Sequence, residues 1–188
     1  MLFASVPLMV LAGCGTTNIS YKPMAAANVA TKVSVGLRIV DERPADKGGT
    51  QKNFIGQVRS SYGIPRALKD ANVVVATSTV GAMTVDALQQ AGLGVGRGSG
   101  KRTLVATIKH FWMDDVQGYK ATVTVQYELQ NASFKIVWSK QLSGVAGGAS
   151  SFTSPEKTAQ ELFGQALADL SSKAAAEFKS SEFQAALG

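Results

Sequence analysis

The residues that could do acid–base chemistry are few. The chain holds one histidine, His110, and an adjacent pair of carboxylates, Asp114–Asp115. We interpret His110 as structural, because it lies on a predicted strand beside Phe111 and Trp112 and no G-x-S-x-G nucleophile pattern occurs. Adjacent aspartates in a turn commonly face water, so this pair does not by itself indicate a general acid and base. The sequence therefore predicts no catalytic residues.

The cysteine and histidine content also limits metal chemistry. One cysteine excludes an internal disulfide and a zinc site built on several thiolates. One histidine excludes the imidazole clusters on which most transition-metal sites depend. We therefore expect a protein that works without a metal or another cofactor.

A glycine-rich stretch from Gly92 to Arg102 resembles a phosphate-binding loop in composition but not in spacing. A dinucleotide fingerprint that begins at Gly94 needs glycine where Ser99 stands, and a Walker loop needs glycine in place of Val95. We predict a helix-to-strand connection here. The alternative is an anion-contacting loop, and its candidate side chains are Arg97, Lys101 and Arg102.

The charged residues indicate a solvated surface. The formal net charge is +6, but no run of basic residues is long enough to mark an interaction tail. Anionic partners that suit a basic protein include nucleic acid, lipid headgroups and acidic polysaccharides. Asp41 and Arg43 are predicted to form a structural ion pair where the first strand ends.

The most specific motif lies at the N-terminus. An apolar stretch from Leu2 to Leu11 runs into Leu11-Ala12-Gly13-Cys14, a lipobox of the bacterial lipoprotein type. An apolar segment followed by small residues is typical of an export signal. The alternative, a buried first element of a cytosolic domain, is disfavoured because Gly13 and Gly15 interrupt any helix or strand. The first basic residue is Lys22, so we expect a basic region upstream of Met1.

The resemblance to bacterial lipoproteins implies a defined processing chemistry. Signal cleavage would fall between Gly13 and Cys14, and the Cys14 sulfur would carry a diacylglycerol thioether with acyl chains such as palmitate. Gly15, rather than aspartate, then favours the periplasmic side of the outer membrane, and export would separate the protein from nucleic acid. Residues 14 to 31 have the composition of a flexible linker, which would place the domain roughly 23 Å from its anchor.

Hydrophobic periodicity predicts one domain over residues 32–188. A period of two predicts strands over 33–39, 103–113, 121–129 and 134–142, with a short edge strand over 54–58 that Pro65 closes. A period of three to four predicts helices from Asp70 to Ala91, capped by Asp70, and from Ser154–Pro155 to Phe178. No stretch is long and apolar enough to span a bilayer.

These elements predict an α+β fold. We expect a two-layer sandwich in which an antiparallel sheet, made of the N-terminal strand and a three-stranded meander, packs against two helices. Residues 1–13 would be a lipoprotein signal peptide, residues 14–31 a lipidated linker, and residues 32–188 the single domain.

A family resemblance accompanies this order of elements. The first strand with Asp41-Glu42-Arg43-Pro44, then Phe54-Ile55-Gly56, the helix that ends at Gly92 and the meander resemble the YajG family of small bacterial lipoproteins. The resemblance covers roughly residues 30–178. It implies an outer-membrane lipoprotein with no catalytic residues to carry over. Size and order are also similar to auxiliary lipoproteins of envelope transport systems.

Three functions follow, in order of preference. The first is a non-enzymatic, lipid-anchored accessory that binds another envelope protein during envelope assembly or transport. The second is a carrier or binder of a small apolar ligand, lipid or glycan, which would need a cavity between helices and sheet. The third is an envelope hydrolase that uses His110 with Asp114–Asp115. The sequence does not decide the oligomeric state.

Overall fold

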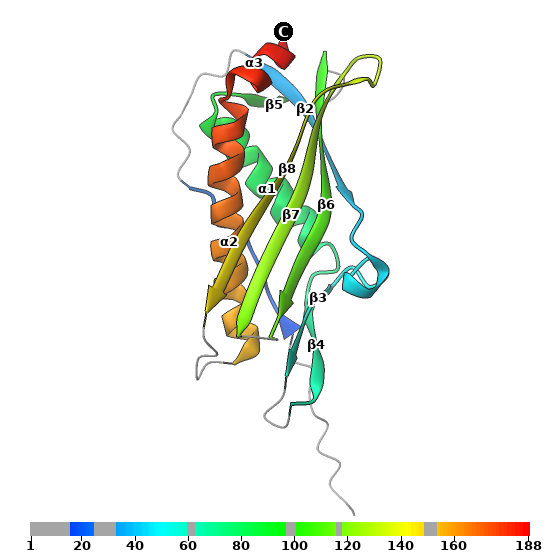
Figure 1. Cartoon of the computed structure of the whole chain (residues 1–188), viewed down its shortest axis with the longest axis vertical. Helices are drawn as coiled ribbons and strands as arrows, with labels where there is room; N and C mark the ends of the chain where they lie inside the picture. Colours follow the sequence, from blue (N-terminus) through cyan, green and yellow to red (C-terminus); the bar gives the residue numbers. More distant parts are fainter. Residues whose placement is uncertain (1–15, 25–32, 60–62, 97–100, 116–117, 149–153) are drawn as a thin grey trace, which may run out of the picture.

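The structure is a computed structural model that describes residues 16–24, 33–59, 63–96, 101–115, 118–148 and 154–188. It is an elongated α+β molecule with helices α1 and α2 on one side of a sheet (Figure 1). The elements are β1 (Thr16–Thr17), β2 (Ser34–Asp41), the short 3-10 helix η1 (Ala45–Lys47), β3 (Phe54–Arg59), β4 (Pro65–Asp70), α1 (Val75–Gln90), β5 (Gly94–Gly96), β6 (Arg102–Asp114), β7 (Tyr119–Asn131), β8 (Ile136–Gly148), α2 (Pro155–Phe178) and α3 (Ser181–Leu187).

The sheet corrects the predicted fold. Within the described residues it has eight strands, in the order β1-β4-β3-β6-β2-β5, with β7 paired to β6 and β8 paired to β7. It is a mixed sheet, because β2 runs parallel to both β5 and β6, and β1 runs parallel to β4. The antiparallel two-layer arrangement of four strands and two helices was therefore wrong, although the α+β class holds. The chain between β2 and β6 is a crossover that contains α1, and such crossovers bring strands back parallel.

The long meander positions most of the core. β6, β7 and β8 have 13 residues each and pair antiparallel. Alternate residues of β7 are buried, as its period of two predicts: Tyr119, Ala121, Val123, Val125, Tyr127 and Leu129. One edge of β6 pairs first with β2 and then, at Met113, with β3. A single long strand thereby joins the two halves of the sheet.

The segment before α1 differs from its prediction. The helix begins at Val75, not at Asp70, and Asp70 instead ends β4. Strand β4 starts at Pro65, where the sequence indicated the end of a strand. β-branched Val73 and Val74 disfavour an early helical turn, while the turn is held by Asn72 N–H donating to Asp70 Oδ1 at 2.8 Å. The connection after α1 also contains β5, which pairs with β2.

The C-terminal helices close the core. α2 begins at Pro155 as predicted, and Ser154 caps it by accepting from Lys157 N–H at 3.3 Å. The phenyl rings of Phe111 and Phe163 stack at 4.5 Å between β6 and α2. The short helix α3 was not predicted, and it buries Phe183 against Trp138 and Phe178. No helix in the described part of the chain is long and apolar enough to cross a membrane.

Candidate functional site

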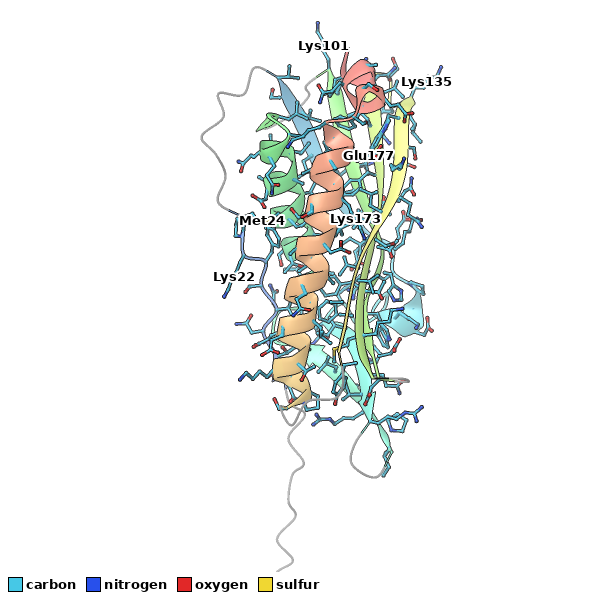
Figure 2. All side chains as sticks on the ribbon, turned by 60° about the vertical axis from the view of Figure 1, so that its left-hand side comes forward. Lys22, Met24, Lys101, Lys135, Lys173 and Glu177 are labelled. Atoms are coloured by element: carbon cyan, nitrogen blue, oxygen red, sulfur yellow. The ribbon has the colours of Figure 1, made fainter. Side chains whose placement is uncertain are left out.

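Several residues singled out by the sequence fall outside the described part of the chain. These are Gly13 and Cys14, where cleavage and lipidation are predicted, and Arg97 of the glycine-rich stretch. The other two candidate anion ligands lie at the end of the molecule that carries α3. Lys101 is exposed there (Figure 2), while Arg102 donates from Nε to the carbonyl of Ala186 at 2.8 Å. Arg102 thus ties β6 to α3.

His110 lies half-buried on β6, on the sheet face opposite the helices, paired across the ladder with Thr124. Burial, followed by the charge of nearby Lys47, lowers the pKa of His110, and Asp114 opposes the shift. The imidazole is therefore neutral at neutral pH. Asp115 accepts from the backbone N–H of Arg59 at 3.3 Å, so it holds β3 beside the end of β6.

The predicted ion pair of Asp41 and Arg43 is confirmed. Arg43 Nε lies 3.0 Å from Asp41 Oδ1, and the guanidinium is fully buried. The same guanidinium donates to the carbonyls of Lys52 at 2.8 Å and Phe54 at 3.1 Å. Gly48 has φ of 93°, and a Cβ there would lie 2.4 Å from the guanidinium. Arg43 therefore organises the loop between β2 and β3, and four of its five N–H donors are used in doing so.

The chain before β2 packs on the domain from Thr16 onwards. We call residues 16–24 the N-terminal segment. Thr17, Ile19 and Tyr21 point inwards, with Thr17 2% and Ile19 5% exposed. Ile19 N–H donates to the buried carboxylate of Asp70 at 2.7 Å, and Ala71 N–H donates to Thr17 O at 2.8 Å. Whether residues 14 to 31 act as a linker stays a prediction, but this part of them belongs to the packed structure.

A buried polar cluster holds the far end of the N-terminal segment. The hydroxyl of Tyr21 donates to Asp86 of α1 in a short hydrogen bond and lies 3.0 Å from the hydroxyl of Ser171 on α2. Met24 N–H and the Gln90 side chain also donate to the same Asp86 oxygen, at 3.2 and 3.0 Å. Burial, followed by the hydrogen bond to Asp86, raises the pKa of Tyr21 to about 12. Tyr21 therefore stays protonated and keeps its role as donor.

A groove runs between the N-terminal segment and α2. Its volume is about 630 Å³, and it is lined by Asn18, Ser20, Lys22, Gln160, Glu161, Gly164, Gln165 and Ala168. The lining residues of the segment alternate with the inward-facing Thr17, Ile19 and Tyr21, while those of α2 recur at helical spacing. Figure 2 shows Lys22 and Met24 where the segment passes beside the helices. We call this feature the polar groove.

The polar groove and the residues beneath it were not predicted from the sequence. A signal was present, because Thr17, Ile19 and Tyr21 alternate with Asn18, Ser20 and Lys22 in the period of a strand with one buried face. The linker-like composition around this short stretch masked that pattern. Asp86 and Ser171 carry no local signal, because their roles depend on a tyrosine far away in the sequence.

The chemistry available to the polar groove is recognition through hydrogen bonds. Its amide and hydroxyl groups are donors and acceptors, and Lys22 and Glu161 supply one charge of each sign. In the described part of the chain, no group of three or more His, Cys, Asp or Glu could hold a metal ion. The space between helices and sheet is filled by fully buried side chains such as Met83, Tyr127 and Phe163.

Comparison with known proteins defines the class of fold. No family model matches the sequence, and no curated protein matches it. The chain shares its α+β fold with a crystal structure of protein XCC0632 from Xanthomonas campestris, described as DUF330. Their TM-score is 0.52 at 17% identity, covering 84% of this chain and 88% of that one. An uncharacterized protein gives a TM-score of 0.51 at 13% identity, over 86% and 99% of the two chains.

A weaker likeness involves a named lipoprotein. Lipoprotein GNA1162 from Neisseria meningitidis gives a TM-score of 0.32 at 16% identity, covering 69% of this chain and 91% of that one. This score is too low to support an argument about the present protein. The comparisons therefore show the fold that this chain shares with DUF330 proteins, and they leave its role to be argued from its own residues.

Proposed function

We propose that this protein is a lipid-anchored lipoprotein on the periplasmic side of the outer membrane, of the YajG-like type. It acts without enzymatic activity, as an accessory that binds another envelope protein during envelope assembly or transport. The observation that carries the proposal is Leu11-Ala12-Gly13-Cys14, which follows an apolar export-type segment. The assignment to YajG-like proteins is supported by Asp41-Glu42-Arg43-Pro44 and Phe54-Ile55-Gly56.

The roles of the charged groups support a non-enzymatic function. Arg43, Asp41 and Asp70 are committed to holding loops and segments together. Asp86 is held by Tyr21 and its neighbours beneath the N-terminal segment. Acid–base catalysis needs a titratable group within reach of a substrate, whereas Arg43, Asp41 and Asp70 are hydrogen-bonded within the fold and Asp86 is buried, with its Oδ1 unpartnered.

The polar groove is the surface we assign to the partner. Amide side chains such as Asn18, Gln160 and Gln165 match the donors and acceptors of a polypeptide backbone. A helix glycine, Gly164, leaves the groove open at its centre, because a Cβ placed there would meet nothing within 4 Å. An extended segment of an envelope protein fits this combination of polar lining and open floor.

The lipidation part of the proposal is tested by intact-protein mass spectrometry on the membrane fraction of the native host. We expect a mature mass that begins at Cys14 with added acyl chains, and its loss in Cys14→Ser. A chain that retains residues 1–13 without modification would contradict the anchor and the localisation.

The binding part is tested with a photo-crosslinking amino acid at Gln165, which lines the polar groove, and at Ser139, on the opposite face of the sheet. We expect a discrete adduct with an envelope protein from position 165 only. Gly164→Trp, which fills the groove, should abolish the adduct and reproduce the envelope phenotype of a deletion strain, whereas Gly164→Ala should not. Equal crosslinking from both positions, or a Gly164→Trp strain that behaves as wild type, argues against the polar groove as the binding surface.

A further inference from the structure

We infer that one end of the domain rests directly on the bilayer that holds the anchor. This hairpin end comprises β1, the strands β3 and β4 and the first turn of α2, and it lies opposite the end that carries α3 (Figure 1). The inference rests on the proposed lipidation of Cys14 and adds the orientation of the domain, which that proposal leaves open.

The folded structure begins almost at the proposed lipidation residue, Cys14. Thr16 and Thr17 pair with Lys69 and Asp70 as an edge strand of the sheet. The hydroxyl of Thr17 also donates to the carbonyl of Glu156 in the first turn of α2, at 3.2 Å. Two elements, β4 and α2, therefore fix the chain at this point.

The chain between Cys14 and Thr16 is too short to act as a free linker. Two residue steps of a fully extended chain span at most about 7 Å. A free linker of 17 residues would instead allow an average of roughly 23 Å and any orientation. Because Thr16 is paired with Lys69 of β4, the Cα atom of Cys14 has to stay within about 7 Å of this point of the sheet.

The pairing of β1 also sets the direction in which the chain continues toward Cys14. Because β1 is parallel to β4, its N-terminal side points the same way as the start of β4 at Pro65. That is the turn side of the hairpin, where Ile64 is 64% exposed and Pro65 is also exposed. The chain therefore leaves β1 in the direction of an exposed apolar side chain, which suits the interface of a bilayer.

Charge does not drive this contact. The hairpin end carries Arg59, Arg66 and Lys157 alongside Asp114, Asp115 and Glu156. Arg66 and Glu156 form an ion pair at 2.8 Å, so the opposite signs largely balance. The covalent anchor and the pairing of β1 therefore set the orientation, and it should persist at high salt.

The orientation decides which surfaces face the periplasm. α2 has 24 residues and runs from the hairpin end to α3. At 1.5 Å per residue it lifts the α3 end about 36 Å from the hairpin end. Lys101 and Lys135, which Figure 2 shows at the α3 end, would then be the basic residues presented farthest from the membrane.

Fluorescence quenching in reconstituted vesicles tests this orientation. The introduced cysteine is the only free thiol once Cys14 is a thioether, since the chain has one cysteine. We would label Ala67→Cys on β4 and Ala132→Cys in the β7–β8 turn, two exposed alanines at opposite ends. The full-length lipidated protein is placed in phosphatidylethanolamine–phosphatidylglycerol vesicles that contain brominated lipid. We expect several-fold stronger quenching at position 67 than at position 132.

Two controls separate the orientation from the anchor. Vesicle flotation and the mass of the Cys14 adduct are measured on every sample: an unmodified Cys14 overturns both the proposed function and this inference. Lipidated protein with equal quenching at the two positions overturns the orientation alone. Insertion of a Gly/Ser segment of about ten residues between Gly15 and Thr16 should keep flotation and bring the two signals toward equality. Quenching that stays asymmetric after insertion also contradicts the inference, because chain length would then not set the orientation.

Discussion

Just after the end of β2, one buried guanidinium donates hydrogen bonds to four oxygen atoms. Arg43 donates to both carboxylate oxygens of Asp41 and to the carbonyls of Lys52 and Phe54. The cost of removing one partner of such a pair exceeds the net gain from forming it, because the remaining groups stay buried without donors. The ion pair therefore matters mainly for the shape of the loop that it holds.

We expect Arg43→Met to lower the free energy of unfolding by about 3–5 kcal/mol. Urea unfolding of the mature domain, without the lipid, measures the change. The matched control is Lys109→Met, which breaks the exposed pair of Lys109 and Glu42 and should cost less than about 1 kcal/mol. Similar losses in the two variants would show that burial does not distinguish these pairs.

The same ion pair predicts a dependence on pH. Burial raises the pKa of Asp41, but hydrogen bonds and the charge of Arg43 outweigh that effect and hold the pKa below its ordinary value of 3.8. A lowered pKa in the folded state contributes stability above pH 3.8, and the contribution is lost as the pH falls through the folded pKa. Stability of the wild type should therefore fall more steeply between neutral pH and pH 3 than that of Arg43→Met. Parallel pH profiles would contradict this role of Arg43.

At the scale of elements, glycines decide how closely helices and strands approach. Gly144 of β8 lies against α2, and a Cβ there would sit 1.9 Å from the carbonyl of Ala166. At Gly164, on α2 itself, an added Cβ would meet no atom within 4 Å. Gly144 is therefore required for the close contact of β8 with α2, whereas the packing of α2 does not require a glycine at position 164.

Opposite effects are therefore expected from two chemically identical substitutions. Gly164→Ala should stabilise the domain by about 0.5–1 kcal/mol, because alanine loses less backbone entropy in a helix. Gly144→Ala should lower the free energy of unfolding by about 1–3 kcal/mol, because β8 must move away from α2. Thermal unfolding of both variants measures the difference, and a stable Gly144→Ala variant would mean that α2 shifts without cost.

The N-terminal segment is an element whose attachment depends on its terminal polar cluster. Tyr21→Phe removes the hydroxyl that donates to Asp86, so we expect the segment to open more readily, by about 1–3 kcal/mol. Hydrogen exchange of the Ile19 amide, which donates to Asp70, reports this opening. Lys22→Gln, on the exposed side of the same segment, should leave the exchange unchanged. Equal protection of Ile19 in wild type and Tyr21→Phe would show that the cluster does not hold the segment.

At the scale of the whole molecule, the described residues form one continuous apolar core that includes the sheet, the helices α1, α2 and α3 and the N-terminal segment. The cluster of buried apolar residues runs from Ile19 in the N-terminal segment to Phe183 in α3. The two tryptophans report on different packing environments: Trp138 belongs to this core and packs against Phe183, whereas Trp112 lies outside it and packs against Phe54. A continuous core of this size in one domain predicts cooperative unfolding.

We therefore expect the single-tryptophan variants Trp112→Phe and Trp138→Phe to unfold in one transition each. In each variant, the midpoint by tryptophan fluorescence should equal the midpoint by far-ultraviolet circular dichroism. A fluorescence transition that precedes the loss of helix in one variant only would identify a subdomain that opens independently.

Local periodicity was enough to find the strongest elements. The alternation in β7 and the apolar stripe of α2 each report a buried face that is complete within one segment, so their bounds were close to those observed. The ion pair of Asp41 and Arg43 was predictable for the same reason, since its partners are two residues apart. The lipobox likewise depends only on consecutive residues, and its processing stays a prediction.

Tertiary structure decided what local patterns do not encode. A period of two indicates that one face of a strand is buried, but it does not indicate which strand lies beside it or in which direction that strand runs. The parallel pairing of β2 with β6 was therefore not predicted. Strands as short as β1 and β5 have too few residues for any period. The polar groove and the Tyr21–Asp86–Ser171 cluster join residues that are remote in sequence. Such contacts exist only after the core has brought α1, α2 and the N-terminal segment together, because their energy comes from burial between elements and not from any one of them.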